Sequence, residues 1–313
     1  MLFSTQTMPP VTQIAESTKP PRGQATSPQT QRSIAEAYRF CKELATHHYE
    51  NFPVGSLFTP PVIRSHIHAI YAFARIADDY ADEGNIPSGE RLNRLDDWQQ
   101  QLDNCFQGRA SHPVFVALAH TVRQLNIPQK PFNDLLVAFR MDVTRNRYEH
   151  FDDLLFYCDH SANPIGRLVL LIWGVSSTDI LHLSDQFCTG LQLANFWQDI
   201  SVDLHKDRIY IPLEDFRRFG YTEHQLREGE TGESFRNLLQ FQVSRTKEIL
   251  TLARPLLKNV GGGLRRELAL TWHGGTTILE KIEAGDFDTL STRPRITAFD
   301  KLRILLGMLM ERR

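Results

Sequence analysis

The 313-residue sequence has little cysteine, little net charge and no long hydrophobic run. Its four cysteines lie far apart without a CxxC pair, which argues against a zinc site or disulfide framework and is typical of the cytoplasm. The formal net charge is −2 and Lys and Arg form no run, which argues against a nucleic-acid partner. The longest strongly apolar stretch, 168–175, is too short to span a bilayer. We therefore expect at most peripheral membrane contact, through a lipid-like substrate or product.

The alternating pattern of β-strands is also missing, and helical periodicity runs through almost the whole chain after residue 31. Residues 1–31 are rich in Pro, Thr, Gln and Ser without apolar periodicity, so we expect a disordered tail. No linker-like segment divides 32–313, which predicts one all-α domain. The expected helices span residues 33–49, 61–83, 88–106, 112–124, 130–147, 164–174, 178–204, 232–257, 262–283 and 297–311.

One acidic cluster follows a thoroughly apolar stretch in the helix expected over 61–83. Residues three and four apart share a helix face, so Asp78 and Asp82 project together. Carboxylates gathered at the end of a buried helix repel one another unless a cation lies among them. Arg75, one turn earlier, is placed to offset part of this charge or to bind a phosphate oxygen.

A second polar cluster lies on another apolar helix, where its side chains form a ladder along one face. It consists of four residues at helical spacing, Gln192, Asn195, Asp199 and Asp203. Two such faces turned towards each other would form a cage of oxygen ligands suited to Mg²⁺ and, through it, to a diphosphate. Beyond the ladder, Lys206 and Arg208 add the positive charge that a diphosphate requires. Acidic pairs are also common on solvated helix faces, but the apolar surroundings of both clusters favour metal binding.

These motifs resemble those of the squalene/phytoene synthase family. Residues 71–83 are similar to its first aspartate-rich motif and residues 192–212 to its second, with further similarity at Arg147-Tyr148, Tyr157-Cys158 and Ile278-Leu279. The resemblance covers roughly residues 32–311. It implies the all-α class I isoprenoid synthase fold, a helical bundle with a central apolar cavity. It also implies an Mg²⁺-dependent enzyme that ionises prenyl diphosphates and joins them head to head.

The same resemblance implies roles for individual residues. The side chains expected to hold Mg²⁺ are Asp78, Asp82, Asn195, Asp199 and Asp203. Those expected to bind the substrate are His48, Asn51, Tyr71, Arg75, Gln192, Lys206, Arg208 and Tyr210. Tyr157 lies where the family has a tyrosine implicated in proton handling. We expect Asp78, Asp82 and Asp199 to be essential for catalysis.

Departures from the family pattern indicate which reaction to expect. Glu50 stands where many members have a basic residue, Gly275 where many have a tyrosine, and Gln198 where many have an arginine. This loss of cationic and aromatic contacts suggests that one diphosphate site is altered. The pattern is similar to the hydroxysqualene synthase branch, which ionises presqualene diphosphate and captures water. We hypothesise that a polar group within 161–163, with Asn163 as the candidate, admits or orients that water.

Three alternatives remain open. A two-step condensing synthase making squalene, dehydrosqualene or phytoene agrees with the intact clusters, although Glu50 and Gly275 count against it. Squalene formation also needs a reductant, and the sequence has no nicotinamide-binding fingerprint. A non-catalytic scaffold with the same fold would be expected to have eroded clusters. A class I terpene cyclase would not account for the basic continuation over 206–212.

Overall fold

The structure is a computed structural model, and it describes residues 28–47 and 59–310. Within these ranges the regular elements are all α-helices, which confirms the predicted all-α class. The first half of the chain forms α2 (Pro28–His47), α3 (Pro61–Asp82), α4 (Ser88–Phe106), α5 (Pro113–Leu125), α6 (Lys130–Thr144) and α7 (Phe151–Ile172). The second half forms α8 (Thr178–Gln198), α9 (Ile200–His205), α10 (Leu213–Arg218), α11 (Glu223–Arg227), α12 (Glu233–Ala253), α13 (Leu256–Asn259), α14 (Gly262–Ala284) and α15 (Ala298–Met310).

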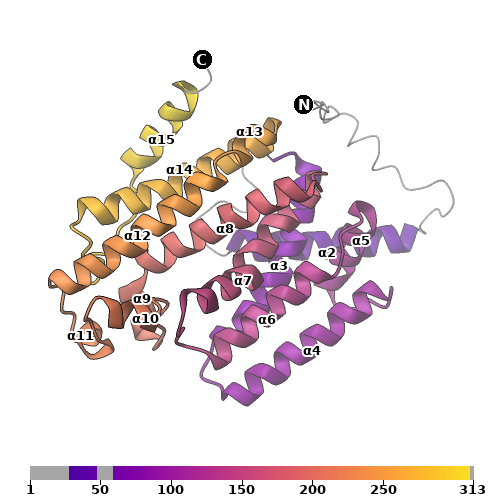
Figure 1. Ribbon diagram of the computed structural model, residues 1–313. Helices are drawn as coiled ribbons and strands as arrows, with labels where there is room; N and C mark the ends of the chain where they lie inside the picture. The colour runs from indigo at the N-terminus through magenta and orange to yellow at the C-terminus, as the bar shows by residue number, and fades with distance from the viewer. Residues whose placement is uncertain (1–27, 48–58, 311–313) are drawn as a thin grey trace.

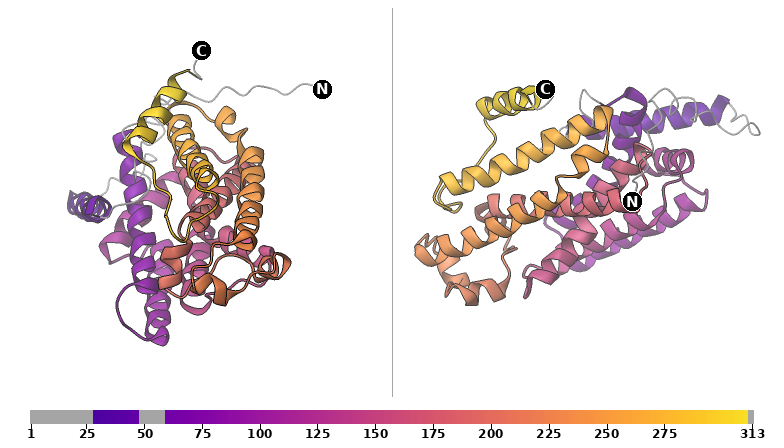
Figure 2. Two further views of the ribbon diagram at one scale, coloured as in Figure 1. Left: turned by 90° about the vertical axis from the view of Figure 1, so that its left-hand side faces the viewer. Right: turned by 45° about the horizontal axis from the view of Figure 1, so that its top comes forward.

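Helix α8 lies at the centre of the bundle, between α7 on one side and α12 and α14 on the other (Figure 1). Helix α3 packs against α2, α4, α5 and α6. Both α3 and α8, which carry the two acidic clusters, also contact α7. Figure 2 shows the same arrangement from two further directions, and α15 contacts α14.

Two groups of buried side chains form the core, and each contains a buried tryptophan whose indole N–H is satisfied. Trp98 of α4 donates its indole N–H to the carbonyl oxygen of Phe73 at 3.2 Å. Trp197 of α8 donates to Thr246 Oγ1 at 2.8 Å. Each indole therefore contributes a large apolar surface without leaving its donor unsatisfied. Leu191 packs against both groups, so the two parts of the core are continuous through α8.

One predicted helix boundary is wrong. The sequence pattern predicts a helix over 164–174, but α7 begins at Phe151 and Pro164 lies inside it. The true start is capped, because the backbone N–H of His150 donates to the Asp153 carboxylate at 3.0 Å. Packing against α6 and α8 holds the helix together although Pro164 provides no N–H for the helical hydrogen bond.

Three other features of the helices differ from the expectation. The helix expected over 178–204 is interrupted at Asp199, which separates α8 from α9. The short helices α10 and α11 occupy a stretch for which the pattern predicts none. Helix α2 begins at Pro28, inside the expected tail, and residues 1–27 lie outside the described ranges.

Cys41, Cys105 and Cys158 are buried, Cys188 is half-buried, and all four are free thiols. In the part of the chain that the structure describes, no helix combines the length and the apolar character needed to cross a membrane.

The contact between α8 and α12 leads to a stability prediction. A Cβ atom at Gly190 would lie 2.6 Å from both Cγ and Cδ2 of the buried Leu250. We expect Gly190→Ala to lower the free energy of unfolding by about 1–3 kcal/mol, because Leu250 has to leave its rotamer. Gly89→Ala is the matched control, because nothing lies within 4 Å of that position. Urea unfolding followed by circular dichroism measures both, and equal stability of the two variants would contradict the prediction.

Candidate active site

A cavity of about 630 Å³ lies between α3, α6, α7, α8 and α14. The residues that line it are polar at one end and mainly apolar at the other. The end nearest the acidic clusters is lined by polar residues, namely Tyr71, Arg75, Asp78, Asp142, Tyr157, Gln192 and Asn195. The opposite end is lined mainly by apolar residues, among them Ile67, Ile70, Val169, Ile172, Phe187 and Leu264. A molecule with a charged head and a long apolar chain matches this distribution.

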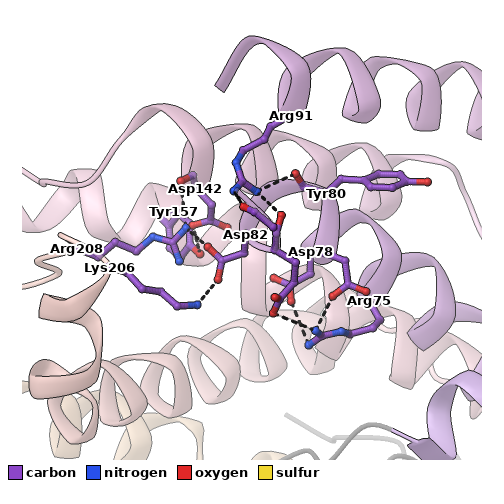
Figure 3. Close-up of polar contacts among 12 residues, drawn as sticks. Arg75, Asp78, Tyr80, Asp82, Arg91, Asp142, Tyr157, Lys206 and Arg208 are labelled. Atoms are coloured by element: carbon purple, nitrogen blue, oxygen red, sulfur yellow. Dashed lines mark hydrogen bonds and ion pairs between the residues drawn. The ribbon is translucent and has the colours of Figure 1, made fainter. Parts of the chain in front are cut away.

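The first acidic cluster lies at the C-terminal end of α3, and that end is tied down by Arg91. The Arg91 guanidinium donates to the carbonyl oxygens of Tyr80 at 3.4 Å, Glu83 at 3.0 Å and Gly84 at 2.6 Å (Figure 3). The last carbonyls of a helix have no partner within the helix, so this contact satisfies them. It thereby holds in place the turn that presents Asp82.

Cations from two segments neutralise this cluster. Arg75 lies 3.4 Å from Asp78 and 2.5 Å from Asp79 on its own helix. Asp82 binds Lys206 and also Arg208, whose Nη2 lies 2.6 Å from the Asp82 Oδ1 (Figure 3). Burial would raise the pKa of Asp82, but the hydrogen bonds and charges of Lys206 and Arg208 outweigh it and lower the pKa. This contact joins the two motifs predicted from the sequence.

The second ladder continues across the break between α8 and α9. The Asp199 N–H donates to the Asn195 carbonyl at 3.0 Å, and the Asp203 N–H donates to the Asp199 carbonyl at 2.9 Å. The helical hydrogen-bond pattern therefore continues across the break, and Asn195, Asp199 and Asp203 keep their spacing of four residues. Burial and the negative charge of Asp199 raise the pKa of Asp203 to about 7, while Arg208 acts in the opposite direction.

Arg293 is a functional candidate that the sequence analysis missed. Its Nε and Nη2 atoms bind the two carboxylate oxygens of Asp199 at 2.6 and 3.0 Å. The segment that carries Arg293 follows α14 and is held by Gln198, whose Nε2 donates to the Pro294 carbonyl at 2.7 Å. No helical periodicity marks this segment, so the sequence pattern contained no signal that places Arg293 beside Asp199.

Asp142 of α6 is a second missed residue, and it lines the cavity beside Tyr157. The Tyr157 hydroxyl donates to Asp142 Oδ1 at 2.9 Å, and Arg208 Nη2 donates to the Asp142 backbone carbonyl at 3.2 Å (Figure 3). Burial raises the pKa of Asp142 to about 7, helped by the negative charges of Asp78 and Asp82 and opposed by Arg208. Burial also raises the pKa of Tyr157 well above its ordinary value.

The predicted site residues differ in where they lie relative to the cavity. Those that line the cavity are Tyr71, Arg75, Asp78, Tyr157, Gln192 and Asn195. Those beside its polar end, linked to it by the ion pairs and charges above, are Asp82, Asp199, Asp203, Lys206 and Arg208. Tyr210 lies behind Tyr157, with ring centroids 5.9 Å apart, and stacks on Phe196 at 3.8 Å. His48 and Asn51 lie outside the described residues.

The structure argues against the role predicted for Asn163. Its side chain is 3% exposed and is not part of the cavity wall. Its Nδ2 donates to Asp159 Oδ1 at 2.7 Å, and its Oδ1 accepts from Thr189 Oγ1 at 3.0 Å. Asn163 therefore connects α7 to α8. Ser161, in the same predicted segment, does line the cavity and donates to the Tyr157 carbonyl at 2.9 Å.

The donor set at the polar end fits a magnesium ion chemically. It consists of carboxylate and amide oxygens, the ligands that Mg²⁺ prefers. Asp78 and Asn195 both line this end of the cavity. Among the described residues, no three His, Cys, Asp or Glu side chains already converge on a metal site. Asp78, Asp82 and Asp199 are paired with Arg75, Lys206, Arg208 and Arg293 instead, so a metal ion bound there would have to replace ion pairs.

Known proteins resemble this chain over most of its length. A model of the squalene/phytoene synthase family matches residues 45–300. A phytoene synthase of Arthrospira platensis is 30% identical over 289 residues, which cover 88% of this chain and 93% of that protein. A 15-cis-phytoene synthase of a Synechocystis strain is 29% identical, with 87% and 84% covered.

Solved structures share the fold. The crystal structure of squalene synthase HpnC from Alicyclobacillus acidocaldarius has a TM-score of 0.78 and 37% identity, covering 82% of this chain and 96% of that one. A dehydrosqualene synthase in complex with a ligand has a TM-score of 0.79 at 21% identity, covering 90% and 98%. These likenesses confirm the expected isoprenoid synthase fold.

The raised pKa of Asp142 leads to a prediction about stability and pH. The folded protein has to hold this carboxylate charged above about pH 7, whereas an unfolded chain has it charged above its ordinary value near 4. We expect Asp142→Asn to raise the free energy of unfolding at pH 8 by on the order of 4 kcal/mol without added metal, since each unit of pKa difference corresponds to about 1.4 kcal/mol. The gain should shrink between pH 7 and pH 5, because the wild type then binds its proton in the folded state.

Urea unfolding of both proteins at pH 8, 7, 6 and 5 measures this difference. Asp96→Asn removes an exposed carboxylate of α4 and is the control, for which we expect no such pH dependence. A stability difference between Asp142→Asn and wild type that is constant from pH 8 to pH 5 would contradict the prediction.

Proposed function

The chain belongs to the squalene/phytoene synthase family, and from this membership we propose that it converts presqualene diphosphate and water into hydroxysqualene and diphosphate. The family consists of enzymes that act on prenyl diphosphates. The observation that carries the proposal is the cavity itself, with cations and carboxylates at one end and apolar walls at the other. Such a cavity holds the diphosphate group and the C30 chain of one substrate at the same time.

Two substituted positions support a single diphosphate site. Gln198, which replaces the arginine found in many relatives, is almost buried and uses its amide to hold the Pro294 carbonyl. It therefore supplies no positive charge to a diphosphate. At Gly275, where many relatives have a tyrosine, a Cβ atom would lie 2.5 Å from Leu191 Cδ2. Leu191 thus takes the space that a larger side chain at position 275 would need.

The chain's own residues bind the head group and shield the cation. Arg75, Lys206 and Arg208 supply positive charge at the polar end and release their carboxylate partners as the diphosphate binds. The residues that would hold Mg²⁺ are Asp78, Asp82, Asn195, Asp199 and Asp203. When bound there, Mg²⁺ neutralises the negative charge of the departing diphosphate. Diphosphate leaves with the electron pair of the C–O bond, and the cyclopropylcarbinyl cation rearranges between apolar walls.

The apolar part of the cavity serves both binding and selectivity. Each methylene of the substrate buried there contributes roughly 0.8 kcal/mol. The same walls keep bulk water from the carbocation, so that water reaches it only at a polar position. Ser161, which lines the cavity one turn after Tyr157, replaces Asn163 as the group that we propose to orient that water. The oxygen of the water then forms the new C–O bond, and one proton is released.

A condensing synthase is the second candidate, and a specific observation favours it. The relatives at 30% and 29% identity are phytoene synthases. Against this, the squalene synthase HpnC is 37% identical, which supports a C30 rather than a C40 product. Such an enzyme would join two prenyl diphosphates before ionising the product of that step.

Product analysis distinguishes the two candidates. We expect the purified protein with Mg²⁺ to convert presqualene diphosphate into hydroxysqualene, and to leave farnesyl and geranylgeranyl diphosphate unchanged. Gas chromatography with mass spectrometry identifies the products. Formation of a C30 or C40 hydrocarbon from either of the shorter diphosphates would refute the proposal and support the condensing synthase. Addition of EDTA should abolish turnover in either case.

A pair of carboxylate variants tests the predicted metal ligands. We expect Asp78→Asn and Asp199→Asn to lower kcat/KM for presqualene diphosphate by roughly 100-fold or more, because each removes a charged ligand. Asp96→Asn, whose carboxylate pairs with Arg140 on the surface, should retain wild-type activity. Circular dichroism checks that the fold is kept. Activity of the two ligand variants close to that of Asp96→Asn would contradict the assignment.

A further inference from the structure

We propose that Asp142 is the group that takes up the proton released when water adds to the carbocation. This inference rests on the proposed hydroxysqualene-forming reaction and assigns a residue to its last step. It concerns a side chain that neither acidic motif contains. Asp142 lies on α6 and lines the polar end of the cavity.

The geometry places this carboxylate at the cavity surface and leaves it uncommitted to a cation. Asp142 lines the cavity together with Tyr157 and Ser161. Its Oδ1 accepts a hydrogen bond of 2.9 Å from the Tyr157 hydroxyl. Arg208 approaches, but it donates to the backbone carbonyl of Asp142 at 3.2 Å and pairs with the Asp82 carboxylate (Figure 3). The Asp142 side chain has no ion pair within 4.0 Å among the described residues.

Two other carboxylates line the cavity, and both have different partners. Asp78 is paired with Arg75 and belongs to the predicted metal ligands. Glu267 of α14 accepts a hydrogen bond from Thr59 and lies towards the apolar end, beside Leu264. Asp142 is therefore the cavity carboxylate that combines a polar neighbourhood with the absence of a salt bridge.

The charged groups around Asp142 come from several segments. Asp78 and Asp82 on α3 act to raise its pKa, and Arg208 after α9 acts to lower it. Tyr157 on α7 donates its hydroxyl to the carboxylate, and the uncharged phenols of Tyr148 and Tyr210 also lie near it. Burial is the largest influence and brings the pKa of Asp142 to about 7. A group that titrates near the working pH both accepts and returns a proton readily.

The proposed step balances in atoms and charge. A lone pair of the water oxygen forms the C–O bond to the carbocation, and the oxygen then carries a positive charge. One O–H bond breaks, and its proton moves to an oxygen of the Asp142 carboxylate, leaving hydroxysqualene and a neutral carboxylic acid. Tyr157 holds the carboxylate in position throughout. The proton passes to solvent when the products leave, so no oxidant or reductant is needed.

Replacing the carboxylate by an amide tests this step. Asp142→Asn keeps an oxygen that accepts from Tyr157 but has no basic site. We expect diphosphate release from presqualene diphosphate to stay within about threefold of wild type, while the hydroxysqualene share falls by about tenfold or more. The cation should lose a proton to the released diphosphate instead and form a C30 hydrocarbon. A coupled diphosphate assay and mass spectrometry of the products give the two readouts.

The wild-type protein offers a second measurement that needs no variant. Its hydroxysqualene share should fall as the pH is lowered from 8 to 6, because Asp142 becomes protonated in that range. Asp142→Asn should show a low share without this pH dependence. A purely structural role of Asp142 would lower the amount of all products together and leave their ratio unchanged, which would overturn the inference.

The proposed function and this inference fail in different ways. If the wild type does not consume presqualene diphosphate, both are refuted. If the wild type makes hydroxysqualene and folded Asp142→Asn makes the same share of it, the proton acceptor is refuted while the function stands. Asp96→Asn is carried through each assay as the matched control, and we expect it to keep the wild-type product ratio.

Discussion

The neutralisation of clustered carboxylates is the constraint on which the rest of this structure depends. Asp78 and Asp82 lie at the end of a helix whose preceding turns are buried, where unpaired negative charges are costly. Their cations come from α3 itself and from the segment after α9, so the ion pairs also connect the two halves of the bundle. The same cations are the ones that a diphosphate requires. On the proposed function, binding of substrate and Mg²⁺ would exchange these partners at a site that already carries both signs of charge.

The carboxylate of Asp142 has no cation paired with it within residues 28–47 and 59–310. The nearby guanidinium of Arg208 serves Asp82 and the Asp142 backbone, which leaves the Asp142 carboxylate with a phenol as its partner. Burial then raises its pKa to about 7, which lowers the folding stability increasingly as the pH rises from near 4 to about 7. A buried carboxylate that lowers the folding stability and lines the cavity is a candidate for a role in the reaction.

Prediction from the sequence succeeded where local spacing decides the outcome. The helical positions of Asp78, Asn195 and Gln192 follow from periods of three and four, and all three line one cavity. It failed where packing overrides local preference. Pro164 lies inside α7 because neighbouring helices hold the turns on both sides of it. Asn163 sits one residue away from the expected face, and on a helix one residue corresponds to about 100°, which turns it towards α8.

The sequence by itself therefore determined the helical class, the two polar faces and the family, since each depends on residue types at short, regular intervals. Only the tertiary structure decided which cations meet which carboxylates, because partners such as Asp82 and Arg208 are far apart along the chain. It also decided that Gln198 holds the Pro294 carbonyl, that Arg293 reaches Asp199, and that Asp142 faces the cavity. These contacts depend on how helices and loops pack against one another, and no periodicity within a single segment carries that information.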